Sequence, residues 1–431
     1  MRVGIVGGGL AGLTAAYELA RRGHEVALFE REEPLGGQAS TFELEGQRLE
    51  KFYHHIFASD IDIINLIEEL GLRNRLEWLD SRVGFLHGGK VYDFVTPMDL
   101  MRFAPLSAVD RVRLGIISLY LRRSRGWRRL ERTTAKAWLM KYGGKRNYRV
   151  VWGPLLRNKF GASHDEVSMA WLWGKVHLRF TSRQGGRERL GYMRDSFGVL
   201  IDALVDRITG FGGQIHTSST VGQIVVKNGR AVGLQLGWET HPFDAVIATV
   251  PSPALLRMVP QMPEDYARKL ERVRYQMAVC LVLIMEKPLT DIYWMNISDP
   301  TMPFVALIEH TNLVDASVYG GKNVLYVSNY LSPEDHFASF NGDELLNEYI
   351  PHLKKVNPEF EPSWVDECYL FREEAGQPIV TTGYSAQMPG HRTPIRGLYL
   401  ANTTQIYPED RGMNYSVRLG RRVADLVNED A

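Results

Sequence analysis

The chain has 431 residues, 45% of them hydrophobic, so it is long enough for two or three domains with packed cores and is not expected to be disordered. Lysine and arginine (51) balance aspartate and glutamate (50), so the net charge of +1 gives no whole-molecule indication of a nucleic-acid or anionic-membrane partner. The two cysteines, Cys280 and Cys368, are too few for a disulfide framework and lack metal-ligand spacing, which excludes a disulfide scaffold and fits a reducing compartment.

The first thirty residues follow the pattern of a βαβ unit. Residues 2–6 form a short apolar run, 7–12 a glycine turn, 13–22 a helix with its alanines and leucines on one face, and 24–30 a second apolar strand. This order predicts a doubly wound α/β sheet, in which ligands bind at the carboxyl ends of the strands.

Beyond residue 60 the chain leaves this pattern and becomes helical and strongly basic from about 99 to 149. The α/β pattern returns near residue 196, and a second excursion with mixed strands and a helix occupies residues 256–367. The expected later elements are a helix at 198–209, strands at 214–217, 221–226, 245–250, 278–285 and 324–330, a helix at 342–356, a strand at 397–401 and a helix at 414–427.

We therefore predict an α/β fold with a Rossmann-type nucleotide-binding domain and a discontinuous mixed α+β substrate domain. The nucleotide-binding domain is expected to comprise residues 1–60, 190–255 and 368–431, and the substrate domain residues 61–189 and 256–367 with the basic helical part at 99–149. The N-terminus has no long apolar stretch before a cleavage site, and no uncharged apolar run reaches bilayer-spanning length. We expect a cytoplasmic protein, with membrane association left open.

The glycine turn fits G-x-G-x-x-G. Gly7 makes the tight turn, Gly9 lets the backbone approach a pyrophosphate and Gly12 lets the helix pack on the strand, while the helix N-terminus at Leu10 and Ala11 presents N–H groups to the phosphates. Glu30 follows Gly12 by 18 residues at the end of the second strand, where a carboxylate accepts ribose hydroxyl protons. Strand, turn, helix and acid together predict a dinucleotide site.

The segment E-R-E-E-P-L-G-G-Q-A-S-T, residues 30–41, resembles the flavin amine oxidase, protoporphyrinogen oxidase and phytoene desaturase superfamily, whose pattern is E-x-x-x-x-x-G-G-R-x-x-T. The resemblance implies FAD as the cofactor, with a doubled glycine running against its flavin end. Gln38 stands where the family usually has arginine. The cofactor contacts implied in this segment are Glu30, Arg31, Gly36, Gly37, Gln38 and Ala39.

The final segment, GLYLANTTQIYPEDRGMNYSVRLGRRVADLV at 397–427, is similar to the closing segment of the same family. The resemblance implies a strand, a polar junction and a helix whose N-terminus faces the flavin, where it stabilises negative charge on the reduced ring. Asn402 stands where the family has an acid after glycine. The implied contacts here are Asn402, Gly412, Met413 and Asn414, with Val221 near the adenine.

The strip Lys51-Phe-Tyr-His-His-Ile-Phe57 follows Glu50 where the family chain packs on the flavin face. Tyr53 and His54 are expected flavin neighbours, and His54 and His55 are the candidate catalytic residues, because an imidazole with a pKa near 6.5 takes or gives a proton as hydride moves. Packing or hydrogen-bonded structural histidines are the alternative. The strip also resembles UDP-galactopyranose mutase, which uses reduced FAD without net redox.

Residues 102–149 contain fourteen lysines and arginines with apolar residues between them. Such a segment fits contact with an anionic membrane surface or reception of a phosphorylated or lipidic substrate, and equally an ordinary solvated helical face. No nucleic-acid-binding motif accompanies it. The oligomeric state is left open.

The leading hypothesis is an FAD-dependent oxidoreductase in which an apolar or amine-like small-molecule substrate gives a hydride to flavin N5, and oxygen, a quinone or another external acceptor reoxidises the flavin. The alternative is a mutase-like isomerase that uses reduced FAD on a sugar nucleotide, and a third possibility is a flavin scaffold without turnover. No metal is expected.

Overall fold

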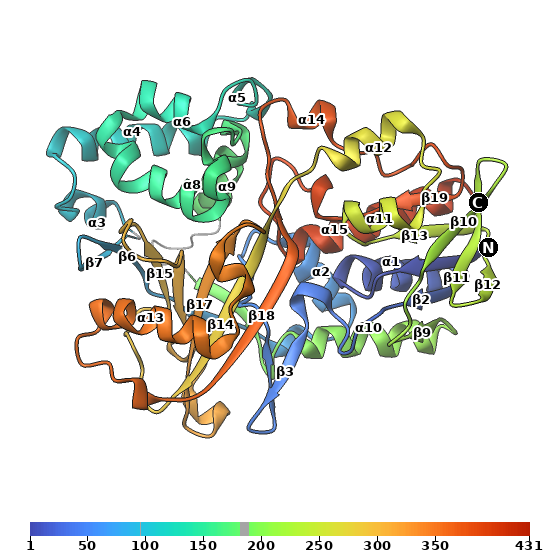
Figure 1. The fold of residues 1–431 in the computed structure, drawn as a ribbon, viewed down its shortest axis with the longest axis horizontal. Helices are drawn as coiled ribbons and strands as arrows, with labels where there is room; N and C mark the ends of the chain where they lie inside the picture. Colours follow the sequence, from blue (N-terminus) through green and yellow to red (C-terminus); the bar gives the residue numbers. More distant parts are fainter. Residues whose placement is uncertain (95, 182–188) are drawn as a thin grey trace.

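The computed structural model describes residues 1–94, 96–181 and 189–431. Figure 1 shows two lobes: one holds both chain termini and a parallel sheet with its helices, and the other holds a larger mixed sheet with a separate layer of helices beside it. The predicted fold class, a Rossmann-type domain with a discontinuous α+β domain, is confirmed. The residue boundaries between the domains stay predictions.

The first lobe is built on a five-stranded parallel sheet in the order β19-β13-β1-β2-β9. Its strands are β1 (Arg2–Val6), β2 (Glu25–Phe29), β9 (Gln214–His216), β13 (Ala245–Ala248) and β19 (Leu398–Leu400). Both faces are covered, which explains why these strands read as continuous apolar runs. Each of them coincides with a predicted strand to within one or two residues.

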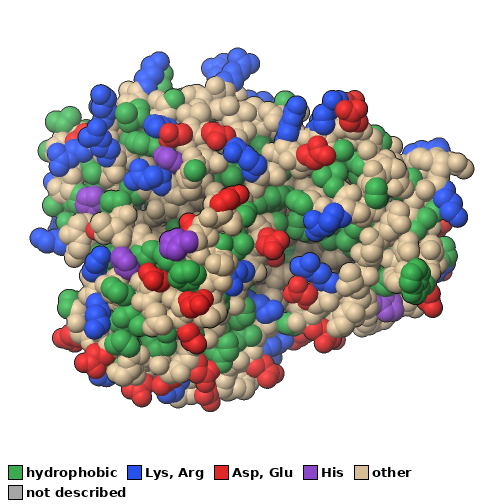
Figure 2. Space-filling model, viewed as in Figure 1, with side chains coloured by type: hydrophobic (Ala, Val, Ile, Leu, Met, Phe, Trp, Pro, Cys, Tyr) green, Lys and Arg blue, Asp and Glu red, His purple; other side chains and the backbone are tan. Residues whose placement is uncertain are grey.

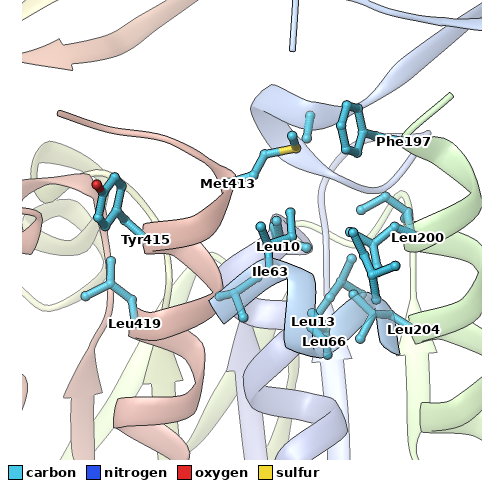
Figure 3. Packing of buried hydrophobic residues seen from close by; sticks show 14 of the residues in the cluster. Leu10, Leu13, Ile63, Leu66, Phe197, Leu200, Leu204, Met413, Tyr415 and Leu419 are labelled. Atoms are coloured by element: carbon cyan, nitrogen blue, oxygen red, sulfur yellow. The ribbon is translucent and has the colours of Figure 1, made fainter. Parts of the chain in front are cut away.

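Helices α1 (Leu10–Ala20), α10 (Gly198–Gly210) and α15 (Met413–Glu429) share one buried apolar cluster with this sheet. Figure 3 shows leucines of α1 and α10, Met413 and Leu419 of α15, and Ile63 and Leu66 of α2 (Ile61–Glu69) projecting into it. The other face packs on a second cluster that includes strands β10 (Gln223–Lys227) and β11 (Arg230–Leu236) and helices α11 (Ser252–Met258) and α12 (Glu264–Glu271). Strand β12 (Glu239–Pro242) pairs with β11 at the edge of the same small sheet. The two clusters fix the position of the carboxyl end of β1.

The second lobe contains a seven-stranded sheet in the order β18-β14-β17-β16-β15-β6-β7. Its strands are β6 (Val83–His87), β7 (Lys90–Asp93), β14 (Tyr275–Met285), β15 (Trp294–Ile297), β16 (Ala306–Glu309), β17 (Asn323–Leu331) and β18 (Val365–Pro378). All neighbours are antiparallel except β15 and β6. On β14, side chains point alternately toward the first lobe and toward α13 (Gly342–Val356), so a sheet covered on both faces explains its unbroken apolar sequence.

The basic part of the chain is helical, as predicted, and forms a layer with its own apolar core. It contains α3 (Pro97–Arg102), α4 (Ala108–Arg123), α5 (Trp127–Leu130), α6 (Ala135–Trp138), α7 (Lys145–Asn147), α8 (Gly153–Phe160) and α9 (Met169–Thr181). Short elements join the lobes: β3 (Thr41–Leu44), β4 (Gln47–Glu50), β5 (Leu76–Asp80), β8 (Arg189–Met193) and α14 (Tyr384–Gln387). In the described ranges, no helix combines the length and apolar character needed to cross a bilayer.

Candidate functional site

The glycine turn lies where the sequence places it, between the carboxyl end of β1 and the N-terminus of α1. Gly7 has φ of +109°, a left-handed conformation that favours glycine, and a Cβ on Gly12 would lie 2.0 Å from the Gly7 carbonyl oxygen. Gly9 is the N-cap of α1 and has no side-chain cap among the described residues. The open helix end, flanked by partly accessible Gly9 and Ala11, therefore offers backbone N–H groups to an anion.

Glu30 stands beside this turn at the end of β2. Its carboxylate accepts hydrogen bonds from the backbone N–H of Gly8 at 2.6 Å and of Glu32 at 3.1 Å. Arg31 is exposed and pairs with the Glu32 carboxylate, and Val221 is buried in the apolar cluster below β10. The acid is thus held at the edge of the turn, with lone pairs left for a ribose.

The doubled glycine packs directly on the first turn. Gly36 N donates to Gly8 O at 2.9 Å, and a Cβ on Gly37, which has φ of +58°, would lie 3.2 Å from Gly9 Cα. Gly37 is nevertheless exposed, whereas Ala39 is buried. The backbone segments around Gly9 and Gly37 therefore border one solvent-accessible gap. A separate cavity of about 600 Å³ lies beside the same loop, and Ala39 is the one predicted site residue in its lining.

The N-terminus of α15 opens on the same region. Gly412 is exposed at the N-cap, while Met413 is buried and points with Leu10 of α1 into a shared apolar cluster (Figure 3). The Asn414 Oδ1 accepts the backbone N–H of Ile63 at 3.1 Å and so joins α15 to α2. The backbone of α15, with Gly412 at its open end, therefore faces the accessible gap between Gly9 and Gly37.

Asn402 is buried and its side chain is occupied by protein partners. Its Oδ1 accepts the N–H and the hydroxyl of Thr404, and its Nδ2 donates to Val250 O at 2.9 Å. Asn402 therefore holds the turn after β19 against the end of β13. Its predicted contact with the cofactor stays a prediction.

The strip at Tyr53–His55 crosses from the first lobe to the second. His54 Nδ1 lies 2.6 Å from Phe52 O, which only accepts, so Nδ1 carries the hydrogen and Nε2 keeps a lone pair. Burial lowers the pKa of His54 to about 4, and burial with Arg179 nearby lowers that of His55 to about 3. Both rings are therefore neutral near pH 7.

Tyr53 and His55 are held by aromatic neighbours. Tyr53 OH accepts from Ser328 Oγ at 3.2 Å and its ring meets Trp294 edge-on, with centroids 4.9 Å apart. His55 packs edge-on against the same Trp294 at 5.6 Å, and its Nδ1 lies 3.1 Å from Tyr293 OH. This frame fixes the strip while leaving its side chains partly accessible.

Glu50, just before this strip, is a buried brace. Its carboxylate accepts the backbone N–H of Phe197 and the hydroxyl of Tyr192, each at 2.7 Å, and burial raises its pKa. Tyr326 of β17 donates to Glu50 O at 2.7 Å. The acid thereby ties the histidine strip to α10 and to the second sheet.

A cluster that sequence reasoning missed lies beside Gln38. Lys159 of α8 and Lys175 of α9 donate to the Asp410 carboxylate at 2.6 and 2.9 Å, and Arg411 donates to Tyr330 OH at 3.0 Å. The pair Asp410-Arg411 next to Gly412 was a signal in the sequence. Lys159 and Lys175 lie on helices without a recognisable motif, so no local sequence pattern predicted that they would contact Asp410.

Comparison with known proteins identifies relatives along the whole chain. Residues 10–428 match the model of a family described as flavin containing amine oxidoreductase. The chain is 22% identical over 468 aligned residues to the 15-cis-phytoene desaturase of an Oncidium hybrid cultivar, covering 100% of this chain and 78% of that protein.

Solved structures share the fold at low identity. A putative protoporphyrinogen oxidase from Exiguobacterium sp. 255-15 matches with a TM-score of 0.79 and 19% identity, over 100% of this chain and 99% of the other. Reduced UDP-galactopyranose mutase matches with a TM-score of 0.77 and 16% identity, over 100% and 96%. At these identities the two structures show that the fold is shared and nothing further.

Proposed function

The chain belongs to the flavin-containing amine oxidoreductases, and from this premise we propose that it oxidises a small apolar or amine-like substrate by hydride transfer to FAD, with oxygen, a quinone or another external acceptor. The chain is an FAD-dependent oxidoreductase in this family sense. The finer reaction rests on one observation: Gly9, Gly37 and Gly412 are accessible at the meeting point of two helix N-termini and the Tyr53–His55 strip.

The residues present fit FAD. The open N-terminus of α1 is suited to the diphosphate, and Glu30 to the adenosine ribose. A side chain on Gly37 would fill the gap between the Gly37 loop and the Gly9 turn, so the glycine keeps a path open for the rest of the cofactor. The N-terminus of α15 offers a positive dipole end to the ring that gains negative charge on reduction.

FAD, when bound, supplies the chemistry by accepting a hydride at N5 and passing the electrons on. The protein orients the substrate and excludes water. Because His54 is neutral and presents Nε2, we propose that it accepts a hydrogen bond from the substrate rather than acting as an imidazolium acid. His55 packs edge-on against Tyr293 and Trp294 and is assigned a structural role, holding this segment of the chain against the second sheet.

The test is anaerobic reduction of the flavin by candidate substrates. We expect an amine, a porphyrinogen or a polyene to bleach the visible bands, and oxygen or a quinone to restore them. His54→Gln should slow the bleaching roughly 100-fold, within the usual range for a proton-handling group, while His336→Gln, at an exposed histidine of the second lobe, should not. An isomerase would instead need reduced FAD, convert a UDP-sugar and consume no acceptor, and that outcome would contradict the proposal.

We also propose that the surface of α3 and α4 contacts an anionic lipid surface. Five side chains form a stripe along α4 at heptad-like spacing and are largely exposed: Val109 (75%), Val112 (51%), Ile116 (63%), Leu119 (43%) and Tyr120 (55%). Met98 (57%) and Met101 (47%) on the neighbouring helix α3 are also exposed. Lys and Arg dominate this end of the molecule, above and around α4 in Figure 2, so charge favours an anionic partner.

Vesicle sedimentation tests this contact. The protein should bind vesicles of phosphatidylglycerol and not of phosphatidylcholine, and Ile116→Glu should abolish binding. Trp238→Glu is the matched control, because Trp238 is fully exposed in the other lobe. A second copy of the chain would set the same arginines against one another, so a dimer that Ile116→Glu dissociates would overturn the lipid assignment.

A further inference from the structure

We propose that the charged cluster beside the cofactor loop binds an anionic group of the substrate, a carboxylate or a phosphate, and so selects acids over amines. The charged cluster comprises Lys159, Lys175, Asp410, Arg411 and Tyr330. The inference rests on the proposed function for the position of the flavin and narrows its substrate class: a substrate that carries an acid group is favoured, and a simple protonated amine is disfavoured.

The charged cluster lies between the cofactor loop and the helical layer. Arg411 donates to Gln38 Oε1, next to the exposed Gly37, and is followed in the chain by the exposed Gly412. Lys159 and Lys175 reach the same place from the helical layer. A substrate lying on the flavin side of Gln38 would therefore meet these cations.

Positive charge is in excess in this cluster. The same oxygen of Asp410 accepts both ammonium groups, so one carboxylate serves two cations. Arg411 has neutral acceptors only: Gln377 Oε1 at 3.2 Å, Tyr330 OH at 3.0 Å and Gln38 Oε1. Across the described ranges, Asp410 is the only acid that these three cations contact. One carboxylate against three cations leaves two positive charges uncompensated.

One further acid influences the cluster from a distance. Burial raises the pKa of Glu373, and this shift is only partly opposed by the backbone N–H of Ala375, which donates to the carboxylate at 3.2 Å, and by the charges of Arg31 and Arg411. It makes no ion pair with Arg411 in the described structure. The excess charge next to the cofactor loop therefore stands.

The ionisable neighbours respond to this field. Burial would raise the pKa of Tyr330, but Arg411 and Lys159 lower it to about 8. Burial would likewise raise the pKa of Asp410, yet Lys159 and Lys175 hold it well below its usual range. Arg411 also contributes to the lowered pKa of His54. Each shift has the sign expected near a net positive charge.

Both ammonium groups are positioned for an oxyanion, and Lys175 is the accessible one, because the Lys159 side chain is only 13% exposed. Each carries three donors and uses one on Asp410, and the Lys175 side chain is 40% exposed. Trp171 fixes the geometry, since its Nε1 donates to Asp410 at 3.3 Å and both Nζ atoms lie within 6 Å of its ring, at 5.5 and 5.7 Å. A carboxylate or phosphate would neutralise the excess charge, whereas a protonated amine would add to it.

The test uses the FAD-loaded protein and four aromatic probes: benzoate, phenyl phosphate, benzamide and benzylamine. Binding is measured by calorimetry and by the change in the visible spectrum of bound flavin. Benzoate and phenyl phosphate should bind, while benzamide and benzylamine should not at equal concentration. Lys175→Gln should weaken benzoate binding roughly 10- to 100-fold, the loss of one charged hydrogen bond. Lys141→Gln, an exposed lysine outside the charged cluster, should leave it unchanged.

A second variant, with an expected effect opposite to that of Lys175→Gln, distinguishes loss of charge from misfolding of the site. Asp410→Asn removes the carboxylate of the charged cluster and should tighten benzoate binding, which a damaged site would not do. Benzoate should also raise the pKa of Tyr330 above about 8, read from tyrosinate absorbance, and Tyr330→Phe should remove that signal. Equal binding of benzylamine and benzoate to the FAD-loaded protein would overturn the inference alone. Failure to bind FAD would overturn the proposed function instead.

Discussion

The substitution Gly9→Ala separates folding from cofactor binding. Gly9 has φ of −71° and ψ of 173°, which alanine adopts without strain, and the nearest atom to an added Cβ is Gly37 Cα at 3.9 Å. The free protein has room for the methyl group. Because alanine restricts the unfolded chain, we expect the apoprotein to gain about 0.4–1 kcal/mol in free energy of unfolding.

The same methyl group occupies the path of the cofactor. It projects between Gly9 and Gly37 at the open end of α1, where a phosphate would accept backbone hydrogen bonds. Losing one charged hydrogen bond costs about 1.5–3 kcal/mol, so the Kd for FAD should rise at least roughly tenfold. Gly12→Ala behaves differently, because its Cβ would lie 2.0 Å from the Gly7 carbonyl oxygen. That clash with backbone should cost the apoprotein about 1–3 kcal/mol or more.

The assay combines two measurements on each variant. Urea unfolding of the apoprotein gives the free energy of unfolding, and quenching of FAD fluorescence gives the Kd. We expect Gly9→Ala to keep stability and lose FAD affinity, and Gly12→Ala to lose both. An unchanged Kd for Gly9→Ala would refute the placement of the diphosphate at this helix end.

Substitutions at three buried residues give further tests. Burial raises the pKa of Glu309 from 4.5 to about 8, so the stability that its protonated form provides is fully present below pH 4.5 and is lost as the pH rises through 8. Between pH 5 and pH 9 this loss should lower the free energy of unfolding, measured in urea, by up to about 4–5 kcal/mol, and Glu309→Gln should abolish the fall. Burial lowers the pKa of His310 to about 3, so its contribution is lost as pH falls from 6.5 through 3, and His310→Gln should move the acid-unfolding midpoint, followed by circular dichroism, to lower pH. Glu50→Ala orphans the Phe197 N–H and should cost about 2–3 kcal/mol of thermal stability, whereas Glu50→Gln, which keeps an acceptor, should cost less than half as much.

Local patterns predicted the nucleotide-binding half of the fold well. The strand, glycine turn and helix at the N-terminus follow from residues in direct succession, and the glycines take conformations that their neighbours require. Helix α13 was predicted at its observed bounds, because Asn341 and Glu344 form a capping box at its start. Where backbone geometry is set by nearby residues, the sequence is sufficient.

Side-chain environments were harder to predict. An unperturbed imidazole pKa near 6.5 was expected for His54 and His55, and the low values arise from burial among residues of the second sheet, such as Tyr293 and Trp294. The amides of Asn402 and Asn414 bind backbone groups distant in sequence, which no local pattern indicated, and their expected contacts with the cofactor stay predictions. Such partners are set by tertiary packing, and a single sequence does not specify them.

The charged cluster illustrates the same limit. Lys159 and Asp410 are 251 residues apart, and their contact depends on how the helical layer packs against the segment before α15. In the sequence, Lys159 was one basic residue among many. The charge that distinguishes this site became visible only when the two segments met.

The most direct test of the central claim is the visible absorption spectrum of the purified protein, with quantification of the flavin released on denaturation. We predict flavin bands and one FAD per chain, or their recovery when the apoprotein is incubated with FAD. A protein that shows no flavin bands and takes up no added FAD would contradict the account.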